Sequence, residues 1–574
     1  MQTSAAEPSP SVPGPARGLC YVSVVREGQA EALAALERFI AAERAALGGR
    51  AQIEWLWIDL TRAGLPATPA ATALRHPAHN PPQGFELALQ RSGAEHFAWL
   101  PPGGCPLPGR TAASLAAIAR APGAPLFLGS LAIERSGPGA VYEVRPELYH
   151  GRPPAGFEHA LVVSRQALAG LDLAMGVPLE LQAWRRYREG LTRIEAPLCR
   201  LAAERLPALE ARLTEDQALL DAWAAPPADK LAVSVLLATH QRLPVLLECL
   251  EGFARQTLPR GSFEVIAIDD GSRDGTAEAL ASLRLPVPFS GLSVPPGGAA
   301  KARIAGLPRA RGEFVLFVND DTIPDPDLVR AHLAAHAELG PQPVSVLGSF
   351  RQPAEHLDNA LMHLLDRSTL LFGYPAFEPG STIAGRHYYT CNASTPRAAI
   401  EAVGGFDPAF WHYGCEDTDL GLRLEDHGLP LVYRPECGAL HRHFLRPADM
   451  RRRQPLVAFA HVKLIQKHPR VLDEVPAWAN LEKADLARKL ERMQAALPLA
   501  ERALENLAQL DRGALVAAGA SEAALLREFD ALLEELFSRL SGAWWQQGFL
   551  RGFEELGLDG FASLMAPRAL QTQP

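Results

Sequence analysis

The sequence has few cysteines, no long apolar run and no excess of basic residues. Seven cysteines are scattered over 574 residues without a C-x-x-C spacing, which argues against a disulfide framework or a zinc site and favours a reducing compartment. No segment approaches the ~18 uninterrupted apolar residues of a membrane-spanning helix, and residues 1–18 lack the apolar core of a signal peptide. We therefore expect a cytoplasmic protein whose contacts with the inner face of a membrane, where they occur, are peripheral.

Charge and composition are those of an ordinary globular protein. Lys and Arg number 56 against 65 Asp and Glu, so the formal net charge is -9, a balance that does not favour binding to nucleic acid. Hydrophobic residues make up 48% and charged residues 21% of the chain, as in most soluble folds. A length of 574 residues exceeds what one core usually holds, so two or three domains are expected.

The order of residue types divides the chain into five parts. Residues 1–18 are predicted to be a disordered leader, residues 19–224 a first α/β block, and residues 225–230 a linker. Residues 231–474 alternate strand and helix patterns, which predicts a parallel sheet covered by helices on both faces. Residues 475–574 lack strand signals, and their apolar spacing predicts three helices, at 481–506, 522–540 and 542–556.

The most informative segment runs from Phe314 to Asp327. A continuous apolar run predicts a buried strand, which ends in Asn319, Asp320 and Asp321. Adjacent carboxylates at the mouth of a buried strand repel each other and are costly to desolvate, so they require a counter-charge. A divalent cation that carries a diphosphate supplies that charge, because hard cations prefer oxygen ligands. The alternative interpretation is an acidic loop after an edge strand.

Two further predicted strands of the second block end in polar loops. One is followed directly by Thr239 and Arg242, and the next by Asp269 and Asp270. Open α/β sheets bind their ligands outside the carboxyl ends of the strands, so three such loops indicate one common crevice. Each loop taken alone is equally well explained as a solvated turn.

An acidic pair begins a predicted helix further along the chain. Glu416 and Asp417 stand at its start, where a carboxylate is either stabilised by the helix dipole or serves as a general base that deprotonates a hydroxyl. Just upstream, Trp411 belongs to an aromatic group that either packs in the core or offers a flat face to a sugar ring. His441 and His443 follow in the sequence H-R-H, and neutral imidazole is a good ligand for a divalent metal.

Four motifs in this order resemble those of the family 2 glycosyltransferases, which share the GT-A fold. The motifs are V-S-V-L-L-A-T-H-Q-R, E-V-I-A-I-D-D-G-S-R-D-G-T, F-V-N-D-D-T-I-P-D-P-D and G-G-F-D-P-A-F-W-H-Y-G-C-E-D-T-D-L-G-L-R-L. The resemblance covers residues 231–444, and the set of four is far more specific than any single motif. It implies an α/β, Rossmann-like fold of the GT-A class.

The resemblance also implies a role for each matching residue. Asp417 is implied as the catalytic base, with Glu416 as its rival, and Asp321 and His441 are implied as metal ligands. The implied contacts of the donor nucleotide sugar are Thr239, Arg242, Asp269, Asp270, Asn319 and Asp320. The implied acceptor-side residues are Asn392, Arg397 and Trp411.

The implied reaction is transfer of a sugar from a nucleotide-diphosphate sugar to a hydroxyl of a glycan or glycolipid, with inversion and with Mn²⁺ or Mg²⁺ as the cofactor. A polysaccharide or another glycoconjugate is the expected product. The sequence departs from the family pattern where Asn319 replaces the first acidic residue of the D-x-D motif. A neutral amide still bonds to a ribose or to metal-bound water, but it weakens the expected affinity for the metal.

The first block contains segments that resemble those of the second block. Its segments Y-V-S-V-V-R, W-L-W-I-D-L and F-A-W-L-P-P-G-G-C-P-L-P follow the order of the three strand-and-loop motifs, and two prolines recur in the third segment. The positions of the acidic motif carry Pro101, Pro102 and Gly103 instead. A tandem, non-catalytic GT-A-like copy explains this pattern, while an unrelated α/β domain remains the alternative.

Two other functions compete with glycosyl transfer. A nucleotidyltransferase of the same fold also uses acidic residues and a metal, but it leaves the helix that begins at Glu416 and Asp417 unexplained. A non-catalytic protein that binds glycans or nucleotide sugars is favoured only by Asn319. The helical C-terminal part is expected either to pack across the catalytic domain or to pair with another subunit in a homo-oligomer.

Overall fold

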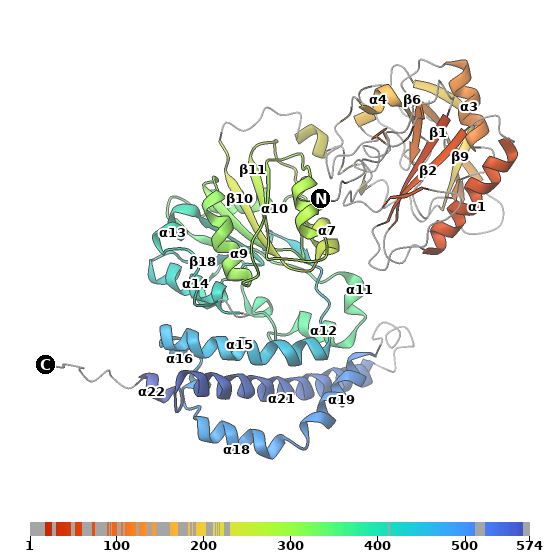
Figure 1. The fold of residues 1–574 in the computed structure, drawn as a ribbon. Helices are drawn as coiled ribbons and strands as arrows, with labels where there is room; N and C mark the ends of the chain where they lie inside the picture. Colours follow the sequence, from red (N-terminus) through yellow and green to blue (C-terminus); the bar gives the residue numbers. More distant parts are fainter. Residues whose placement is uncertain are drawn as a thin grey trace, which may run out of the picture. The chain divides into compact units, whose positions relative to one another are not determined.

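The computed structural model describes residues 230–410, 414–510 and 523–565, and before them separate segments between residues 18 and 222. The chain divides into two compact units (Figure 1). The first comprises residues 1–227 and 282–286, and the second comprises residues 228–281 and 287–574. Each unit contains one large sheet. The division of the second unit into a catalytic and a helical domain at residue 475 stays a prediction.

The second unit is built on an eight-stranded sheet in the order β12-β11-β10-β13-β17-β15-β18-β16. Strands β10 to β13 are parallel to one another, whereas β17 is antiparallel to both β13 and β15. Their bounds are β10 Val233–Thr239, β11 Phe263–Asp269, β12 Phe289–Ser293, β13 Phe314–Asn319, β15 Ser345–Leu347, β16 Thr382–Ile383, β17 Asn392–Pro396 and β18 Leu431–Tyr433.

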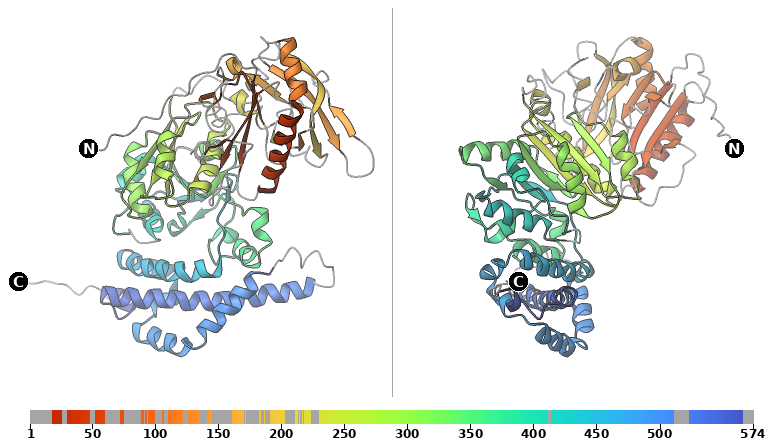
Figure 2. Two further views of the ribbon diagram at one scale, coloured as in Figure 1. Left: turned by 45° about the vertical axis from the view of Figure 1, so that its right-hand side comes forward. Right: turned by 60° about the vertical axis from the view of Figure 1, so that its left-hand side comes forward.

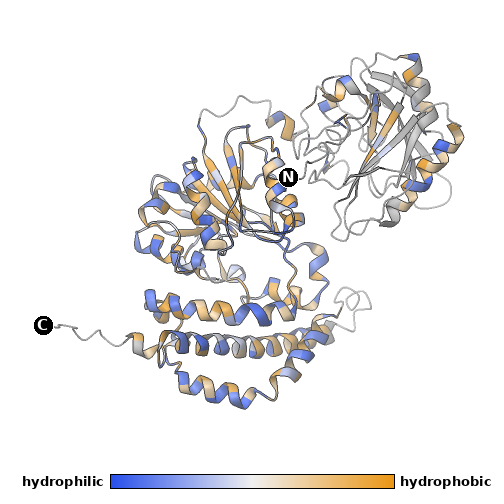
Figure 3. Ribbon diagram, viewed as in Figure 1, coloured by the Kyte–Doolittle hydropathy of each residue, from blue (hydrophilic) through white to orange (hydrophobic). Residues whose placement is uncertain are grey.

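The central strands form because their residues are apolar on both faces, as in a sheet covered on both sides. All seven residues of β11 are buried, and the strands are coloured largely hydrophobic in Figure 3. The covering helices include α7 Leu243–Ala254, α8 Thr276–Ser282, α9 Ala299–Gly306, α10 Leu328–Glu338, α13 Arg397–Ala402 and α14 Glu416–Asp426. The prediction of an α/β sheet covered by helices is therefore confirmed for this unit, but the predicted parallel sheet is in fact mixed, because β16 and β17 run antiparallel to their neighbours.

The registers of the parallel strands bring the three polar loops together. Thr239 pairs with Asp269, and Ala238 pairs with Asn319, so β10, β11 and β13 end at the same edge of the sheet. Directly after β13, the short strand β14 (Thr322–Pro324) pairs antiparallel with β19 (Ala439–His441). The fold therefore carries a distant histidine-bearing segment to the acidic loop.

A helical layer completes the second unit. Helix α15 packs along helix α21 beneath the sheet, as Figures 1 and 2 show, and both helices contribute to one apolar core. The bounds are α15 Pro447–Lys467, α16 Val471–Glu474, α17 Pro476–Ala479, α18 Lys483–Met493, α19 Leu497–Ala508, α21 Ala523–Leu556 and α22 Ala562–Met565. Among the described residues, no helix is both long and apolar enough to cross a bilayer.

Two of the predicted helix boundaries in this layer were wrong. The predicted helix at 481–506 is two helices, α18 and α19, and Pro498 stands in the first turn of the second, where its missing N–H costs nothing. The predicted break at Gly542 does not occur, because α21 continues through it. A glycine in a helix interior lowers its stability by only about 1 kcal/mol relative to alanine, which packing against α15 offsets.

The first unit holds a sheet with the same kind of connectivity. Its main order is β3-β2-β1-β4-β8-β6-β9-β5, and β7 pairs with β6. The strands are β1 Gly18–Val25, β2 Gln52–Asp59, β3 Thr72–Leu74, β4 His96–Trp99, β5 Cys105–Pro106, β6 Leu126–Glu134, β7 Val141–Val144, β8 Leu161–Ser164 and β9 Leu191–Ala202. The helices with bounds are α1 Ala30–Leu47, α3 Arg110–Arg120 and α4 Arg165–Ala169.

The two sheets share the sense of each equivalent strand pair and also the register. Val25 pairs with Asp59 as Thr239 pairs with Asp269. The pairing of β1 with β4 can be aligned in the same way with the pairing of β10 with β13, and Pro106 then occupies the position of Pro324. Each of these two prolines pairs with a residue of an antiparallel strand. The equivalences of Asp59 with Asp269 and of Pro106 with Pro324 agree with the sequence comparison, whereas Tyr21 corresponds to Val235 and not to Val233, a shift of two residues in the first segment.

Candidate active site

The acidic loop after β13 is buried and is neutralised by the loop after β10. Asp320 and Asp321 are only 3% and 1% exposed. The guanidinium of Arg242 donates to both carboxylates, at 2.9 Å from Asp320 Oδ1 and 2.6 Å from Asp321 Oδ2. The hydroxyl of Thr239 donates to Asp320 Oδ2 at 2.7 Å. Burial raises the pKa of Asp320 to about 6, because Arg242 and Thr239 offset the desolvation only in part.

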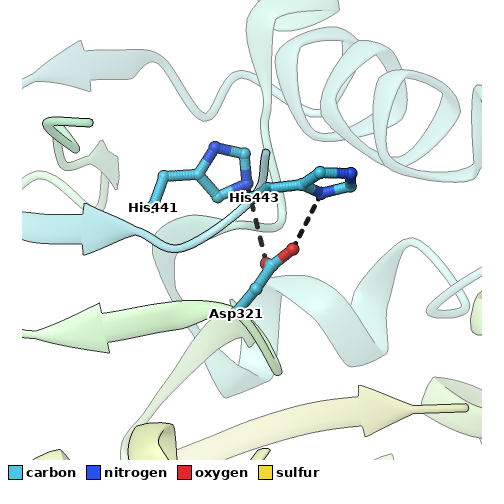
Figure 4. A group of neighbouring side chains, drawn as sticks. All are labelled: Asp321, His441 and His443. Atoms are coloured by element: carbon cyan, nitrogen blue, oxygen red, sulfur yellow. Dashed lines mark hydrogen bonds and ion pairs between the residues drawn. The ribbon is translucent and has the colours of Figure 1, made fainter. Parts of the chain in front are cut away.

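Asp321 lies between two imidazoles, as Figure 4 shows. His443 Nδ1 lies 2.9 Å from Asp321 Oδ2, and His441 Nε2 lies 3.6 Å from Asp321 Oδ1. The three side chains offer ligand atoms that all lie within 4.8 Å of one another. His441 and His443 are two residues apart on an extended segment, so their side chains leave the same face.

The electrostatics of this group suit a divalent cation. Burial lowers the pKa of His441 to about 4, so its imidazole is neutral at pH 7 and the contact with Asp321 is not an ion pair. Burial alone would raise the pKa of Asp321, but the imidazoles and Arg242 hold it well below its usual range. Asp321 Oδ1 is buried and has no hydrogen-bond partner. An ionised carboxylate with an unused oxygen beside the neutral imidazole of His441 fits a metal such as Mn²⁺.

A buried arginine connects the acidic loop to the start of helix α14. Arg303 of helix α9 donates to Glu416 Oε1 at 2.9 Å and to the side-chain oxygen of Asn319 at 3.1 Å. Arg303 is 3% exposed and Glu416 is 9% exposed, so this ion pair is largely shielded from water. Asn319 thus binds Arg303 and is not part of the metal-ligating group. The Glu416 carboxylate is already paired with the same guanidinium. Asp417 is therefore the stronger candidate for a base.

Asp417 has the properties of a general base. Burial, with help from the neighbouring Glu416, raises the pKa of Asp417 to about 6, despite hydrogen bonds from the backbone N–H groups of Thr418 and Thr390. A base is most effective when its pKa lies near the working pH. Burial also raises the pKa of the Cys391 thiol, and the Asp417 and Asp321 carboxylates both add to this effect. Arg303 connects the two regions in space, because it bonds to Asn319, which precedes Asp320, and to Glu416, which precedes Asp417.

Two aspartates at the end of β11, Asp269 and Asp270, organise the neighbouring loops. Asp269 is fully buried and accepts from the backbone N–H of Ser272 at 2.9 Å and from the Ser293 hydroxyl at 2.7 Å. Asp270 accepts at 2.8 Å from the backbone N–H groups of both Gly297 and Gly298, just before helix α9. Their predicted contacts with the donor stay a prediction, and the observed contacts fix the loops at this edge of the sheet.

The sequence also matches known families over this unit. Residues 234–382 match Glycosyl transferase family 2, and residues 376–445 match the family described as the N-terminal domain of galactosyltransferase. The second unit contains a family 2 glycosyltransferase domain. The strand order described above and this match identify its fold as GT-A.

Several curated proteins are similar to this chain. Validoxylamine A glucosyltransferase of Streptomyces hygroscopicus subsp. jinggangensis is 30% identical over 276 residues, which cover 43% of this chain and 63% of that protein. The uncharacterized glycosyltransferase YfnE of Bacillus subtilis is 27% identical over 225 residues, which cover 31% and 57% of the two chains. The chain thus spans less than two thirds of the length of these relatives.

Among solved structures, the mannosyltransferase PcManGT from Pyrobaculum calidifontis, in complex with GDP-Man and Mn²⁺, is 21% identical with a TM-score of 0.37. The similarity covers 60% of this chain and 94% of that one.

The structure corrects two predicted acceptor-side residues of the glycosyltransferase domain. Asn392 is fully buried, and its amide bonds to the carbonyl oxygens of Ser349 and Cys437 and to the ring of His332. Its polar atoms are thus engaged in the interior.

The side chain of Arg397 donates to Gly312 O, beyond the start of β13, whereas Asn319 ends that strand. Six residues of a strand span about 16–20 Å, so Arg397 lies far from the acidic loop. Trp411, the third predicted acceptor-side residue, lies outside the described residues.

The sequence did not predict the contacts between α14, the helix that carries Asp417, and α15. Asp419 is fully buried and receives hydrogen bonds from Arg423 on its own helix and from His468, which follows α15. Lys467 lies 2.6 Å from the same carboxylate. The residue before Glu416, Cys415, has a left-handed φ of 68° and packs its sulfur 3.1 Å from His461 Nδ1 in α15. The helical layer therefore positions the segment that carries Asp417.

Asp419→Ala should destabilise the second unit by about 1–3 kcal/mol, because it leaves the partly buried Arg423 and Lys467 without their carboxylate partner. Urea unfolding monitored by circular dichroism would measure this loss. The matched control is Asp473→Ala, an exposed aspartate of α16, for which we expect a change within about 0.5 kcal/mol. Equal effects of the two substitutions would contradict the structural role of Asp419.

Proposed function

We propose that the protein is an inverting, metal-dependent glycosyltransferase that moves a sugar from a nucleotide-diphosphate sugar to an acceptor hydroxyl. The observation that carries this proposal is the pairing of a metal-ligating group, Asp321 with His441 and His443, with a separate carboxylate of raised pKa, Asp417. Arg303 bonds both to Asn319, beside Asp320, and to Glu416, beside Asp417, which supports one shared reaction centre. The family match supports the same chemistry.

The metal-ligating group would hold a divalent cation through Asp321, His441 and His443. When bound, the cation supplies positive charge that stabilises the leaving nucleoside diphosphate. Two imidazole ligands favour Mn²⁺ over Mg²⁺, because Mg²⁺ strongly prefers oxygen ligands.

Arg242 provides the second positive charge at this centre. Its side chain is 35% exposed, whereas the carboxylates that it contacts are buried. A partly exposed guanidinium can turn from Asp321 to a phosphate once another cation neutralises that carboxylate, and its planar fork suits a phosphate group. Arg242 therefore binds the diphosphate of the donor. Thr239 remains with Asp320 and keeps the acidic loop in place.

Asp417 takes the proton from the acceptor hydroxyl as that oxygen attacks the sugar. Because the leaving diphosphate and the base serve opposite faces of the sugar, a single displacement inverts the anomeric carbon. No covalent intermediate is needed, and Glu416, bound to Arg303, keeps the base close to a second negative charge that raises its pKa. The acceptor belongs to a glycan or another glycoconjugate.

A panel of nucleotide sugars tests this proposal in the presence of Mn²⁺. Since the similar Streptomyces protein is named a glucosyltransferase, UDP-glucose stands first in the panel, with UDP-GlcNAc and GDP-mannose beside it. Release of the nucleoside diphosphate is the expected result. Release of pyrophosphate would support a nucleotidyltransferase, and binding without any product would support a non-catalytic binding protein.

We further propose that the first unit is a degenerate GT-A copy without catalytic activity. The shared strand order and register support it, and the acidic-motif positions are Pro101, Pro102 and Gly103. These residues offer no side-chain oxygen for a metal. Titration calorimetry with Mn²⁺ and UDP should therefore give one site per chain, abolished by Asp321→Asn. Two sites, or a site that survives this substitution, would contradict the proposal.

A further inference from the structure

Four aromatic side chains form a cluster in the glycosyltransferase domain, and we call Phe350, Phe372, Tyr374 and Tyr389 the aromatic cluster. Its ring centroids lie 5.0 Å apart for Phe350 and Phe372, 4.9 Å for Phe350 and Tyr374, and 5.1 Å for Phe372 and Tyr389. All four side chains are of intermediate burial, and Tyr374 and Tyr389 also pack against the apolar core of the domain. Partly buried aromatic rings beside a few polar groups are typical of the lining of a ligand site.

The aromatic cluster extends from the metal-ligating group to the base. At one end, the ring of Phe350 lies 4.4 Å from the ring of His441, and that of Phe372 lies 6.0 Å from it. At the other end, Tyr389 precedes Thr390, whose backbone N–H bonds to Asp417. The rings therefore lie where the transferred sugar and the acceptor have to meet.

The cluster is held in place by hydrogen bonds and packing. The Tyr389 hydroxyl accepts from the backbone N–H of Gly373 at 3.1 Å and lies 2.8 Å from His387 Nδ1. A Cβ at Gly373 would come within 2.5 Å of the Phe377 ring, so this position requires glycine. Rings fixed in this way lose little conformational entropy when a ligand binds.

The chemistry of the cluster selects the shape of its ligand. A six-membered ring that bears hydroxyls, such as a pyranose or a cyclitol, presents a flat face of C–H groups to an aromatic ring and keeps its hydroxyls at the rim. A linear polyol has no such face. Burial of the exposed aromatic area against the flat face supplies affinity, and the rim hydroxyls remain free to reach Asp417.

We propose that the aromatic cluster is the acceptor subsite and that the acceptor is a pyranose or cyclitol ring, not a linear polyol. This inference rests on the proposed glycosyl transfer. Phe372 is the central residue, since it contacts Phe350, Tyr389 and the ring of His441.

The test compares Phe372→Leu, which keeps an apolar side chain without a flat ring, with Phe372→Tyr, which keeps the ring. Methyl α-glucopyranoside and myo-inositol serve as cyclic acceptors and ribitol as a linear one, with release of nucleoside diphosphate as the readout. Loss of one stacked ring should raise the KM for the cyclic acceptors roughly tenfold in Phe372→Leu. The KM of Phe372→Tyr for the cyclic acceptors should stay near the parent value.

Phe529→Leu, the same change at a partly exposed ring of α21, is the control and should leave every parameter unchanged. Saturation-transfer NMR with methyl α-glucopyranoside measures acceptor binding independently of turnover. Equal use of ribitol, equal effects of the two Phe372 variants, an effect confined to donor hydrolysis, or no binding of a cyclic acceptor would each overturn the inference. Failure of the parent protein to release nucleoside diphosphate from any donor would instead refute the proposed function.

Discussion

Asp417→Asn should lower kcat for glycosyl transfer by about 10³-fold, within the usual range for loss of a general base. An amide keeps the size and much of the hydrogen bonding of the carboxylate, and the substitution removes no proposed metal ligand. The Kd for Mn²⁺ and UDP should therefore stay within about threefold of the parent value. The matched control is Asp426→Asn at the end of the same helix, where the carboxylate is 54% exposed. We expect this variant to keep its full activity.

The pH dependence of kcat follows from the same residue. Only the ionised carboxylate accepts a proton, and the pKa of Asp417 is about 6. Above this value kcat should reach a plateau, and below it kcat should fall about tenfold per pH unit as Asp417 becomes protonated. An Asp417→Asn variant with substantial activity, or a parent profile that stays flat down to pH 5, would show that another group takes the proton.

His441→Ala should remove one of the three proposed metal ligands. Loss of a second-shell partner already weakens metal binding by roughly 10–100-fold, so loss of a direct ligand should cost at least as much. Electron paramagnetic resonance of free Mn²⁺ measures this affinity without any turnover. Activity should fall in parallel and recover in part at high Mn²⁺.

An exposed histidine provides the control for this substitution. His427, at the end of α14, is exposed and lies outside the metal-ligating group. His427→Ala should leave both Mn²⁺ affinity and activity unchanged. If His441→Ala bound Mn²⁺ as tightly as the parent protein, the metal would have to be held elsewhere, and the proposed roles of Asp321 and His443 would fail with it.

The loops at the sheet edge could be predicted because each follows a buried strand. The apolar runs that end at Thr239, Asp269 and Asn319 are short and bounded by polar residues, and parallel strands place such ends together. The sequence named Asp321 and His441 as metal ligands but missed His443. A signal for His443 was present, since alternate residues of an extended segment share a face.

Other features depend on contacts between distant segments, which local patterns do not encode. Arg303 sits in an alanine-rich helix with nothing to mark it, and its role appears only when Glu416 and Asn319 meet it in space. Arg397 follows a strand that runs antiparallel to β13, so its motif position suggested a nearby site although the chain direction carries it away. The hydrogen bond between Asp419 and His468, which follows α15, likewise joins segments that are distant in the sequence.

Anomalous diffraction from crystals grown with Mn²⁺ and a nucleoside diphosphate tests the central claim most directly. The account predicts one Mn²⁺ peak bonded to Asp321, His441 and His443, with Arg242 turned from Asp321 toward a phosphate and the Asp417 carboxylate open to the sugar side. The central claim would be contradicted by a crystal structure with bound nucleotide in which Arg242 still contacts Asp321 and Mn²⁺ is absent or bound elsewhere.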